Sequence, residues 1–177
     1  MRKIILNLAI SLDGYICDNT GGFDWITGHG DHSLDTTESD NFDVFLESID
    51  TVVMGSIAYE DCVLTDLATF DDQQIIVATS RNLESRDNVR FVENDICDEI
   101  LALKNQEGKD IFIFGGAGLA DPFIKKDMID MYIIGIIPTI LGSGRKLFKG
   151  EHNEIKLHLK RSTIQDGILI LTYTRRK

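Results

Sequence analysis

Residues 111–122 read IFIFGGAGLADP. Four apolar residues, which are typical of a buried strand, run directly into Gly115, Gly116, Ala117 and Gly118, and the spacing then becomes helical. One glycine is enough for a turn, whereas three glycines in four positions leave the backbone bare. Free N–H groups on a bare backbone at a helix start are suited to phosphate oxygens. The stretch therefore predicts a strand, a turn and a helix, and it raises the question of an anionic ligand.

Apolar runs of this kind recur along the chain. Strands alternate with helices until about residue 137, which is the order of a parallel sheet covered by helices. The turn residues QDG at 165–167 separate two alternating segments and predict a hairpin. We expect an α/β fold in one domain over 1–177, a three-layer and mostly parallel sheet with an antiparallel C-terminal edge. The expected strands are 3–9, 51–54, 74–80, 89–93, 111–114 and 131–137, and the hairpin is 155–165 with 168–175. The expected helices are 37–49 (capped by Thr37), 56–63, one from Ile96 that ends near Gly108, and 117–126.

Residues 10–36 form a long loop that is rich in Gly, Asp and His, and loops of this length are often functional. His29 and His32 have aspartate neighbours, but a glycine-rich loop lacks the rigid frame that a metal site needs. We therefore predict a solvated loop and no metal. Trp25 either covers the mouth of a ligand pocket or anchors the loop, and we favour the first.

The net charge of −11 argues against binding to nucleic acid or to an anionic membrane through the overall field. An anionic ligand must then be held locally, by helix starts and a few placed cations. The N-terminus MRKIILNLAISLDG is either a signal peptide or a first strand. We favour the strand, because Asn7 interrupts the short apolar run and Asp13–Gly14 follows it. No stretch is long and apolar enough to span a membrane.

Three cysteines, Cys17, Cys62 and Cys97, are widely spaced and odd in number. No disulfide framework or metal pair follows from this spacing. The pattern suits a reducing cytoplasm, and we expect buried or half-buried thiols.

Three predicted strand ends share a character that favours a phosphate-bearing ligand. The strands at 51–54 and 111–114 each lead through glycine into a helix, and Ser80 and Arg81 follow the apolar strand residues 75–79. Ligands of open α/β sheets lie beyond these carboxyl ends. Two helix starts can hold a pyrophosphate, and a hydroxyl with a guanidinium suits a further phosphate, as in a nicotinamide dinucleotide phosphate. Each feature alone is common. The Rossmann fingerprint does not fit, because Asp121 occupies its third glycine position.

Six stretches carry a resemblance, in the order SLDGYI, FDW, VVMG with AYE, ATSR, IFGGAGL and PTILGSGRKLF. The chain resembles the family that contains dihydrofolate reductase and the reductase domain of the bifunctional riboflavin-biosynthesis deaminase–reductase, and it is most similar to stand-alone members of the riboflavin-type branch. The resemblance implies a mixed sheet of about eight strands, NADPH as cofactor and a homodimer. It implies hydride transfer to a small heterocycle or a phosphoribosylamino-pyrimidine, as in a 5-amino-6-(5-phosphoribosylamino)uracil reductase.

The resemblance also implies roles for residues and a cis peptide between Gly115 and Gly116. The cofactor phosphates would face the turn after the strand at 111–114, the 2′-phosphate would meet the end of the strand at 74–80, and the first strand and its loop would border the nicotinamide. The implied phosphate residues are Gly115, Gly116, Ala117 and Gly118, with Gly55, Ser56 and Ala58 at the second phosphate-binding helix. The implied 2′-phosphate residues are Ser80 and Arg81. The implied nicotinamide residues are Ala9, Ile10, Gly14 and Ile16.

The sequence departs from the family pattern at the second of these helices. The pattern is glycine, arginine, any residue, threonine, tyrosine; here Ser56 replaces the arginine that would hold phosphate, and Ala58 replaces the threonine that would bond pyrophosphate. In addition, Asp130 is followed by Met131 where the branch often has an acid. Two alternatives stay open: a dihydrofolate reductase, and a non-catalytic nucleotide-binding paralogue.

Two aspartates are candidates for the proton donor. Asp40 lies nearest the place of the acid in a dihydrofolate reductase, and Asp13 lies beside the first strand. The plainer interpretations are a helix N-terminal acid for Asp40 and a turn residue for Asp13. Arg145 and Lys146 in GSGRKLF either meet a substrate phosphate or only offset the acidic surface.

Overall fold

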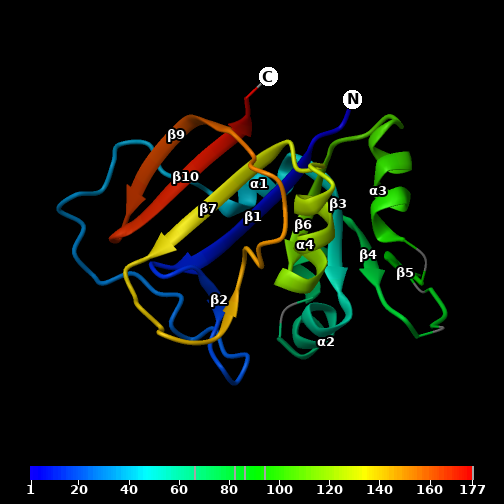
Figure 1. The fold of residues 1–177 in the computed structure, drawn as a ribbon, viewed down its shortest axis with the longest axis horizontal. Helices are drawn as coiled ribbons and strands as arrows, with labels where there is room; N and C mark the ends of the chain where they lie inside the picture. Colours follow the sequence, from blue (N-terminus) through cyan, green and yellow to red (C-terminus); the bar gives the residue numbers. More distant parts are fainter. Residues whose placement is uncertain (66, 82, 86, 94, 177) are drawn as a thin grey trace.

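The computed structural model describes residues 1–65, 67–81, 83–85, 87–93 and 95–176. Eight strands form one sheet in the order β5-β4-β3-β6-β1-β7-β10-β9 (Figure 1). All pairs are parallel except β7 with β10 and β10 with β9. The predicted α/β sheet with an antiparallel C-terminal edge is confirmed. The strands are β1 (Ile4–Ser11), β3 (Ile49–Gly55), β4 (Gln74–Ala78), β5 (Val89–Val92), β6 (Asp110–Gly115), β7 (Met131–Ile137), β9 (Leu157–Gln165) and β10 (Ile168–Arg175).

Helices cover both faces of the sheet because its central strands are apolar on both sides. In β6, Ile111 and Ile113 pack with α3 and α4, whereas Phe112 between them packs on the opposite face with α1 and α2. This alternation follows the period of two along a strand. The helices are α1 (Phe42–Glu47), α2 (Ser56–Thr65), α3 (Ile96–Lys104) and α4 (Ala117–Lys125), and a short 3-10 turn, η1, spans Leu67–Phe70.

The helix predicted at 37–49 is wrong at both ends. It begins at Phe42 and ends at Glu47, and Asn41 rather than Thr37 caps it, because the Asn41 side-chain oxygen accepts hydrogen bonds from two backbone N–H groups of the first turn. The residues before it are held by the C-terminal hairpin instead. Thr36 N–H bonds to the Ile164 carbonyl at 2.9 Å, and the Asp40 carboxylate bonds to the hairpin as well. Contacts with a strand more than 120 residues away therefore override the helical pattern.

A small ribbon lies outside the main sheet and was not predicted. β2 (Tyr15–Cys17) pairs antiparallel with β8 (Arg145–Lys146). The pairing brings the loop after β1 against the loop after β7 (Figure 1). Cys17 and Cys97 are free and buried, as expected, while the side chain of Cys62 lies outside the described part.

Candidate functional site

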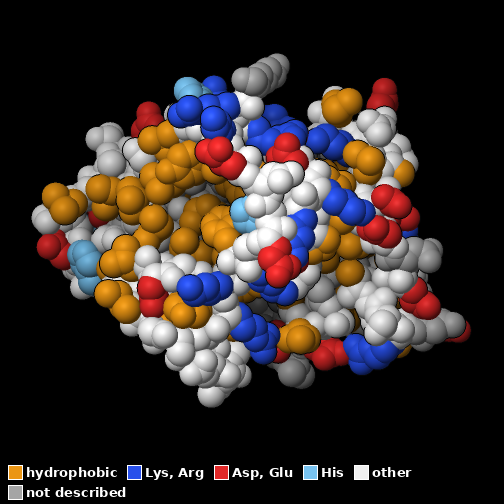
Figure 2. Space-filling view, in the orientation of Figure 1, with side chains coloured by type: hydrophobic (Ala, Val, Ile, Leu, Met, Phe, Trp, Pro, Cys, Tyr) orange, Lys and Arg blue, Asp and Glu red, His pale blue; other side chains and the backbone are white. Residues whose placement is uncertain are grey.

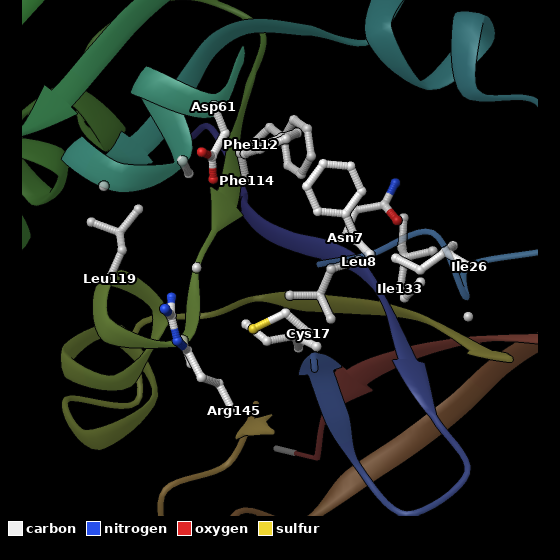
Figure 3. Close-up of a pocket in the computed structure, with 18 of the residues that line it drawn as sticks. Asn7, Leu8, Cys17, Ile26, Asp61, Phe112, Phe114, Leu119, Ile133 and Arg145 are labelled. Carbon is white, nitrogen blue, oxygen red and sulfur yellow. The ribbon is translucent and has the colours of Figure 1, made fainter. Parts of the chain in front are cut away.

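A cavity of about 1000 Å³ opens beyond the carboxyl ends of the central parallel strands. Its lining combines residues of β1, β3 and β6 with the first residues of α2 and α4 (Figure 3). This is the edge at which the sequence predicts a ligand. Nine of the predicted site residues line the cavity: Ala9, Ile16, Asp40, Gly55, Ser56, Ala58, Gly116, Ala117 and Gly118.

The start of α4 presents a bare backbone to this cavity. The Gly115–Gly116 peptide is cis, as the resemblance implied, and Gly115 has a φ of +118°, which L side chains rarely adopt. Gly116 is the N-cap residue, and no side chain caps the helix. The first N–H groups of a helix have no partner within it, so those of Ala117 and Gly118 are available to a ligand.

The start of α2 lies beside the start of α4. Met54 pairs with Gly115 in the sheet, and a Cβ built on Gly55 would lie 3.7 Å from the Gly115 carbonyl oxygen. Gly55, Ser56 and Ala58 all line the cavity. Two helix starts therefore face one space, and their dipoles favour a negative charge there.

Arg145 on β8 adds a positive charge to the same end. It lines the cavity, and its guanidinium points toward the turn between β6 and α4 (Figure 3). Within the described residues, this guanidinium makes no ion pair or hydrogen bond. The Lys149 Nζ lies 3.9 Å from a Cβ built on Gly118. We call this region, with Gly55, Ser56, Gly116–Gly118 and Arg145, the glycine end.

Lys146, the neighbour of Arg145, has a different place. Its Nζ lies 5.6 Å from the centroid of the Tyr15 ring, in a cation–π contact, and it is not among the residues that line the cavity. The sequence left both residues open. The structure brings Arg145 to the cavity because adjacent strand residues point to opposite sides.

The remaining predicted cofactor residues lie outside the lining. Ser80 and Arg81 are exposed beyond the end of β4, and Arg81 forms an ion pair with Glu60 of α2. Ala78, two residues before Ser80, lines the cavity. Ile10 and Gly14 flank the lining residues Ala9 and Ile16, and Gly115 lies behind Gly116.

The carboxylate of Asp13 holds two loops together. It accepts hydrogen bonds from the Ser11 hydroxyl at 2.6 Å and from the backbone N–H groups of Leu141 and Gly142 at 3.1 and 2.7 Å. The bond from Ser11, with those of the two N–H groups, lowers the pKa of Asp13 below 3.8. Asp13 is also absent from the cavity lining. This geometry favours the turn role over proton donation.

Asp40 lines the cavity, but both of its oxygens are engaged. One accepts a hydrogen bond from Arg161 in an ion pair, and the other accepts from the hydroxyl of Thr163, a residue that is buried on β9. The carboxylate thus ties the segment before α1 to β9. This arrangement favours a positioning role for Asp40.

Aromatic rings line a second end of the cavity, away from the glycines. Phe45 of α1 meets Phe112 of β6 edge-on, with ring centroids 5.0 Å apart, and Phe112 meets Phe114 in the same way at 5.7 Å. Sequence reasoning missed these residues as ligand contacts, although the alternation in IFIF places Phe112 and Phe114 on one face. We call this region the aromatic end, which comprises Asn7, Phe42, Phe45, Phe112, Phe114 and Ile133.

The long loop after β2 closes one side of the cavity through Phe23 and Ile26. Trp25 is not among the lining residues, and its indole N–H donates to the Gly22 carbonyl at 3.2 Å. The anchoring role of Trp25 is therefore the one that the structure supports. His32 and Asp35 of the same loop form an exposed pair at 2.9 Å. In the described part of the chain, no group of three or more His, Cys, Asp or Glu side chains is placed to hold a metal ion.

None of the helices in the described ranges is both long enough and apolar enough to cross a membrane.

Burial raises the pKa of the Cys97 thiol to about 11, so this thiol is not a nucleophile at neutral pH.

Comparisons with known proteins agree with this fold. The chain is 37% identical over 164 residues to YwjB, an uncharacterized protein of Bacillus subtilis, with 90% of each chain covered. A crystal structure of a Shewanella sp. PV-4 protein assigned to riboflavin biosynthesis superposes with a TM-score of 0.82 at 26% identity, over 100% of both chains.

Two more distant structures share the fold. The deaminase/5-amino-6-(5-phosphoribosylamino)uracil reductase of Thermotoga maritima has a TM-score of 0.69 at 18% identity, over 99% of this chain and 57% of that one. Dihydrofolate reductase of Enterococcus faecalis, complexed with NADP(H), has a TM-score of 0.66 at 18% identity, over 99% of this chain and 97% of that one. The family model for the RibD C-terminal domain matches residues 60–170, more than half of the sequence. The chain therefore belongs to the RibD C-terminal domain family.

Proposed function

We propose that the protein is an NADPH-dependent reductase that acts on a small heterocyclic substrate. The observation that carries this proposal is the glycine end. There the starts of α2 and α4 border one cavity together with the guanidinium of Arg145, which has no partner in the described part of the chain. A dinucleotide needs such a set of donors for its pyrophosphate. Family membership supports the same class of reaction.

The backbone N–H groups of Ala117 and Gly118 would bind the pyrophosphate, and Gly116 would let it approach closely. Arg145 and Lys149 would neutralise its charge from the other side. Ser56 lacks the guanidinium of the family pattern, and Arg145 from β8 supplies one to the same space. Arg145 would thus compensate for the arginine and threonine of the family pattern that are absent at positions 56 and 58, with the cation placed on a different element.

Two further parts of the site would hold the rest of the cofactor. Ser80 and Arg81 would bind the 2′-phosphate, for which Arg81 must exchange the exposed carboxylate of Glu60 for the phosphate. Ala9 and Ile16, with Ile10 and Gly14 beside them, would border the nicotinamide. Bound NADPH supplies a hydride from its nicotinamide ring.

The proton of the reduction would come from water at the cavity mouth. Asp13 and Asp40 each use their carboxylate oxygens in hydrogen bonds within the protein. The same engagement argues against the dihydrofolate reductase alternative, which needs a free acid on the first helix. The non-catalytic alternative is favoured by Ser56 and Ala58, and it predicts cofactor binding without turnover.

Trp25 offers a direct test, because it is the only tryptophan of the chain and its neighbours Phe23 and Ile26 line the cavity. Bound NADPH should quench Trp25 emission and show a saturable energy-transfer signal. A titration to millimolar NADPH with neither effect, in a folded sample, would contradict the proposal. Trp25→Phe gives the control that assigns the signal.

We also propose a homodimer. The strands β1, β7, β10 and β9 carry apolar residues on the face that α4 leaves uncovered, and Figure 2 shows hydrophobic side chains gathered there. Leu169, Leu171 and Ile164 are half-buried on this face, and Leu159 at its edge is 47% exposed. A second copy would cover these residues and the open edge of β9.

A further inference from the structure

The aromatic end is shaped for a flat, apolar group. Phe42 and Phe45 come from α1, Phe112 and Phe114 come from β6, and Ile133 closes the side toward β7. Phe42 meets Phe112 edge-on, with ring centroids 6.4 Å apart and an interplanar angle of 75°, and it is tilted by 30° to Phe45 at 5.9 Å. Phe112 is 1% exposed, whereas Phe42 is 45% exposed and lines the cavity, so the Phe42 ring is the one that a planar ligand can contact most fully.

The side-chain oxygens of Asp40 and Asn41, the two polar residues that precede α1, already accept hydrogen bonds within the protein. Both oxygens of Asp40 bond to Arg161 and Thr163, and the Asn41 side-chain oxygen caps α1. The Asn7 carboxamide has no hydrogen-bond partner among the described residues, and it lies beside the aromatic rings and Ile133 (Figure 3). Asn7 can therefore donate one hydrogen bond to a ligand.

The charges of the cavity argue against an anionic group at this end. Among the described lining residues, the charged ones are Asp40, Asp61 and Arg145. Arg145 lies at the glycine end, near Leu119 of α4 and away from Ile26 and Ile133 (Figure 3). Arg161 of β9, which reaches Asp40, is already paired with that carboxylate. A phosphate or carboxylate placed here would meet a carboxylate and lose water without gaining a free cation.

We propose that the aromatic end receives an uncharged, planar heteroaromatic compound with a carbonyl or imine group, bound through Asn7, and that it excludes a phosphorylated substrate. This inference rests on the proposed reductase function only for turnover, and it deepens that function by naming the substrate class. In the reduction, the hydride adds to the carbonyl or imine carbon, and a proton from water adds to the oxygen or nitrogen. An alcohol or amine and the oxidised nicotinamide result.

Calorimetry with matched probes tests the inference on the full chain. Quinoline-3-carbaldehyde and quinoline-3-carboxylate share one ring system and differ in charge, and uridine 5′-monophosphate serves as the phosphorylated pyrimidine. We expect the aldehyde to bind at least about tenfold more tightly than either anion. Equal or tighter binding of an anion, or no saturable binding of the aldehyde, would overturn the inference.

Two substitutions on α1 localise the effect. Phe42 lines the cavity and is 45% exposed, whereas Val44 is 61% exposed and does not line it. Phe42→Lys should reduce the preference for the aldehyde over the carboxylate about tenfold or more, while Val44→Lys, with the same added charge on the same helix, should leave it unchanged. Equal shifts in both variants would mean a general charge effect and would refute the assignment of the aromatic end.

Asn7→Leu, which keeps a side chain of similar size, should lower the affinity for the aldehyde about tenfold and leave the affinity for NADPH unchanged. An unchanged aldehyde affinity would remove Asn7 from the site. Measuring the probes with and without NADPH separates the two proposals. If NADPH does not bind but the aldehyde still binds more tightly than the two anions, only the reductase proposal is refuted. If NADPH binds and an anion binds as tightly as the aldehyde or more tightly, only the proposed substrate class is refuted.

Discussion

Arg145 and Lys146 are adjacent cations with different surroundings. The guanidinium of Arg145 lies at the cavity with no partner among the described residues, and Lys146 lies over the ring of Tyr15. Replacing Arg145 with Gln should therefore weaken NADPH binding about tenfold or more, the loss typical of one charge-assisted hydrogen bond. Lys146→Gln removes the same charge one residue away and should change the affinity little. Calorimetric titration of both variants checks this, and equal losses would count against the assigned role of Arg145.

Asp13 gives a pH-dependent contribution to stability. The hydrogen bond from Ser11 is the main cause of its lowered pKa, so the stability that it provides is fully present above pH 3.8 and is lost as the pH falls through the lower folded value. Asp13→Asn should lower the melting temperature at pH 7, and the difference from the wild type should narrow below pH 3.8. Asp24→Asn is the control. A difference that is constant with pH would contradict the role of the charged form.

The start of α4 can be tested with a pair of glycines. Gly115 has a φ of +118°, so Gly115→Ala should cost about 1–3 kcal/mol in the free energy of unfolding. A Cβ on Gly118 would have only Lys149 Nζ within 4 Å, at 3.9 Å, so Gly118→Ala should keep the stability. The same substitution should nevertheless lower the affinity for NADPH, because the added methyl group would occupy the space of a phosphate oxygen. Denaturant unfolding and calorimetry measure the two effects, and an unchanged NADPH affinity in Gly118→Ala would contradict this placement.

The predictability of each element depends on how local its cause is. β6 and the turn after it follow from IFIFGGAG alone, because buried strands and helix starts are encoded in neighbouring residues. The start of α1 does not follow from neighbouring residues, because Thr36 and Asp40 form hydrogen bonds with β9. The pairing of β2 with β8 joins segments about 130 residues apart, and neither is long enough to show a pattern.

The part of the candidate site that is formed by backbone could be predicted from the sequence. Gly55 and Gly116–Gly118 stand out in the sequence because glycine has few other reasons to cluster at strand ends. The place of Arg145 depends on the β2–β8 ribbon, and Phe45 reaches the cavity only because α1 begins at Phe42. These positions follow from long-range packing, which a local pattern does not contain.

At the scale of the whole molecule, the uncovered sheet face predicts a dimer. Leu159 is 47% exposed on this face, and His158 points to the opposite side of β9. Leu159→Glu should therefore raise the dimer dissociation constant about tenfold or more, and His158→Glu should leave it unchanged. Analytical ultracentrifugation over a range of concentrations measures it. A wild-type protein that is monomeric throughout that range would contradict the proposed interface.

We propose that the cavity of this RibD C-terminal domain protein binds NADPH. Calorimetric titration with NADPH, and with NADH in parallel, measures this binding. We expect saturable one-site binding of NADPH. NADH should bind about tenfold more weakly or worse, because Ser80 and Arg81 would then lack the 2′-phosphate. Equal affinity for both cofactors would remove Ser80 and Arg81 from the site. The absence of saturable NADPH binding at millimolar concentration would show that this cavity is not an NADPH site.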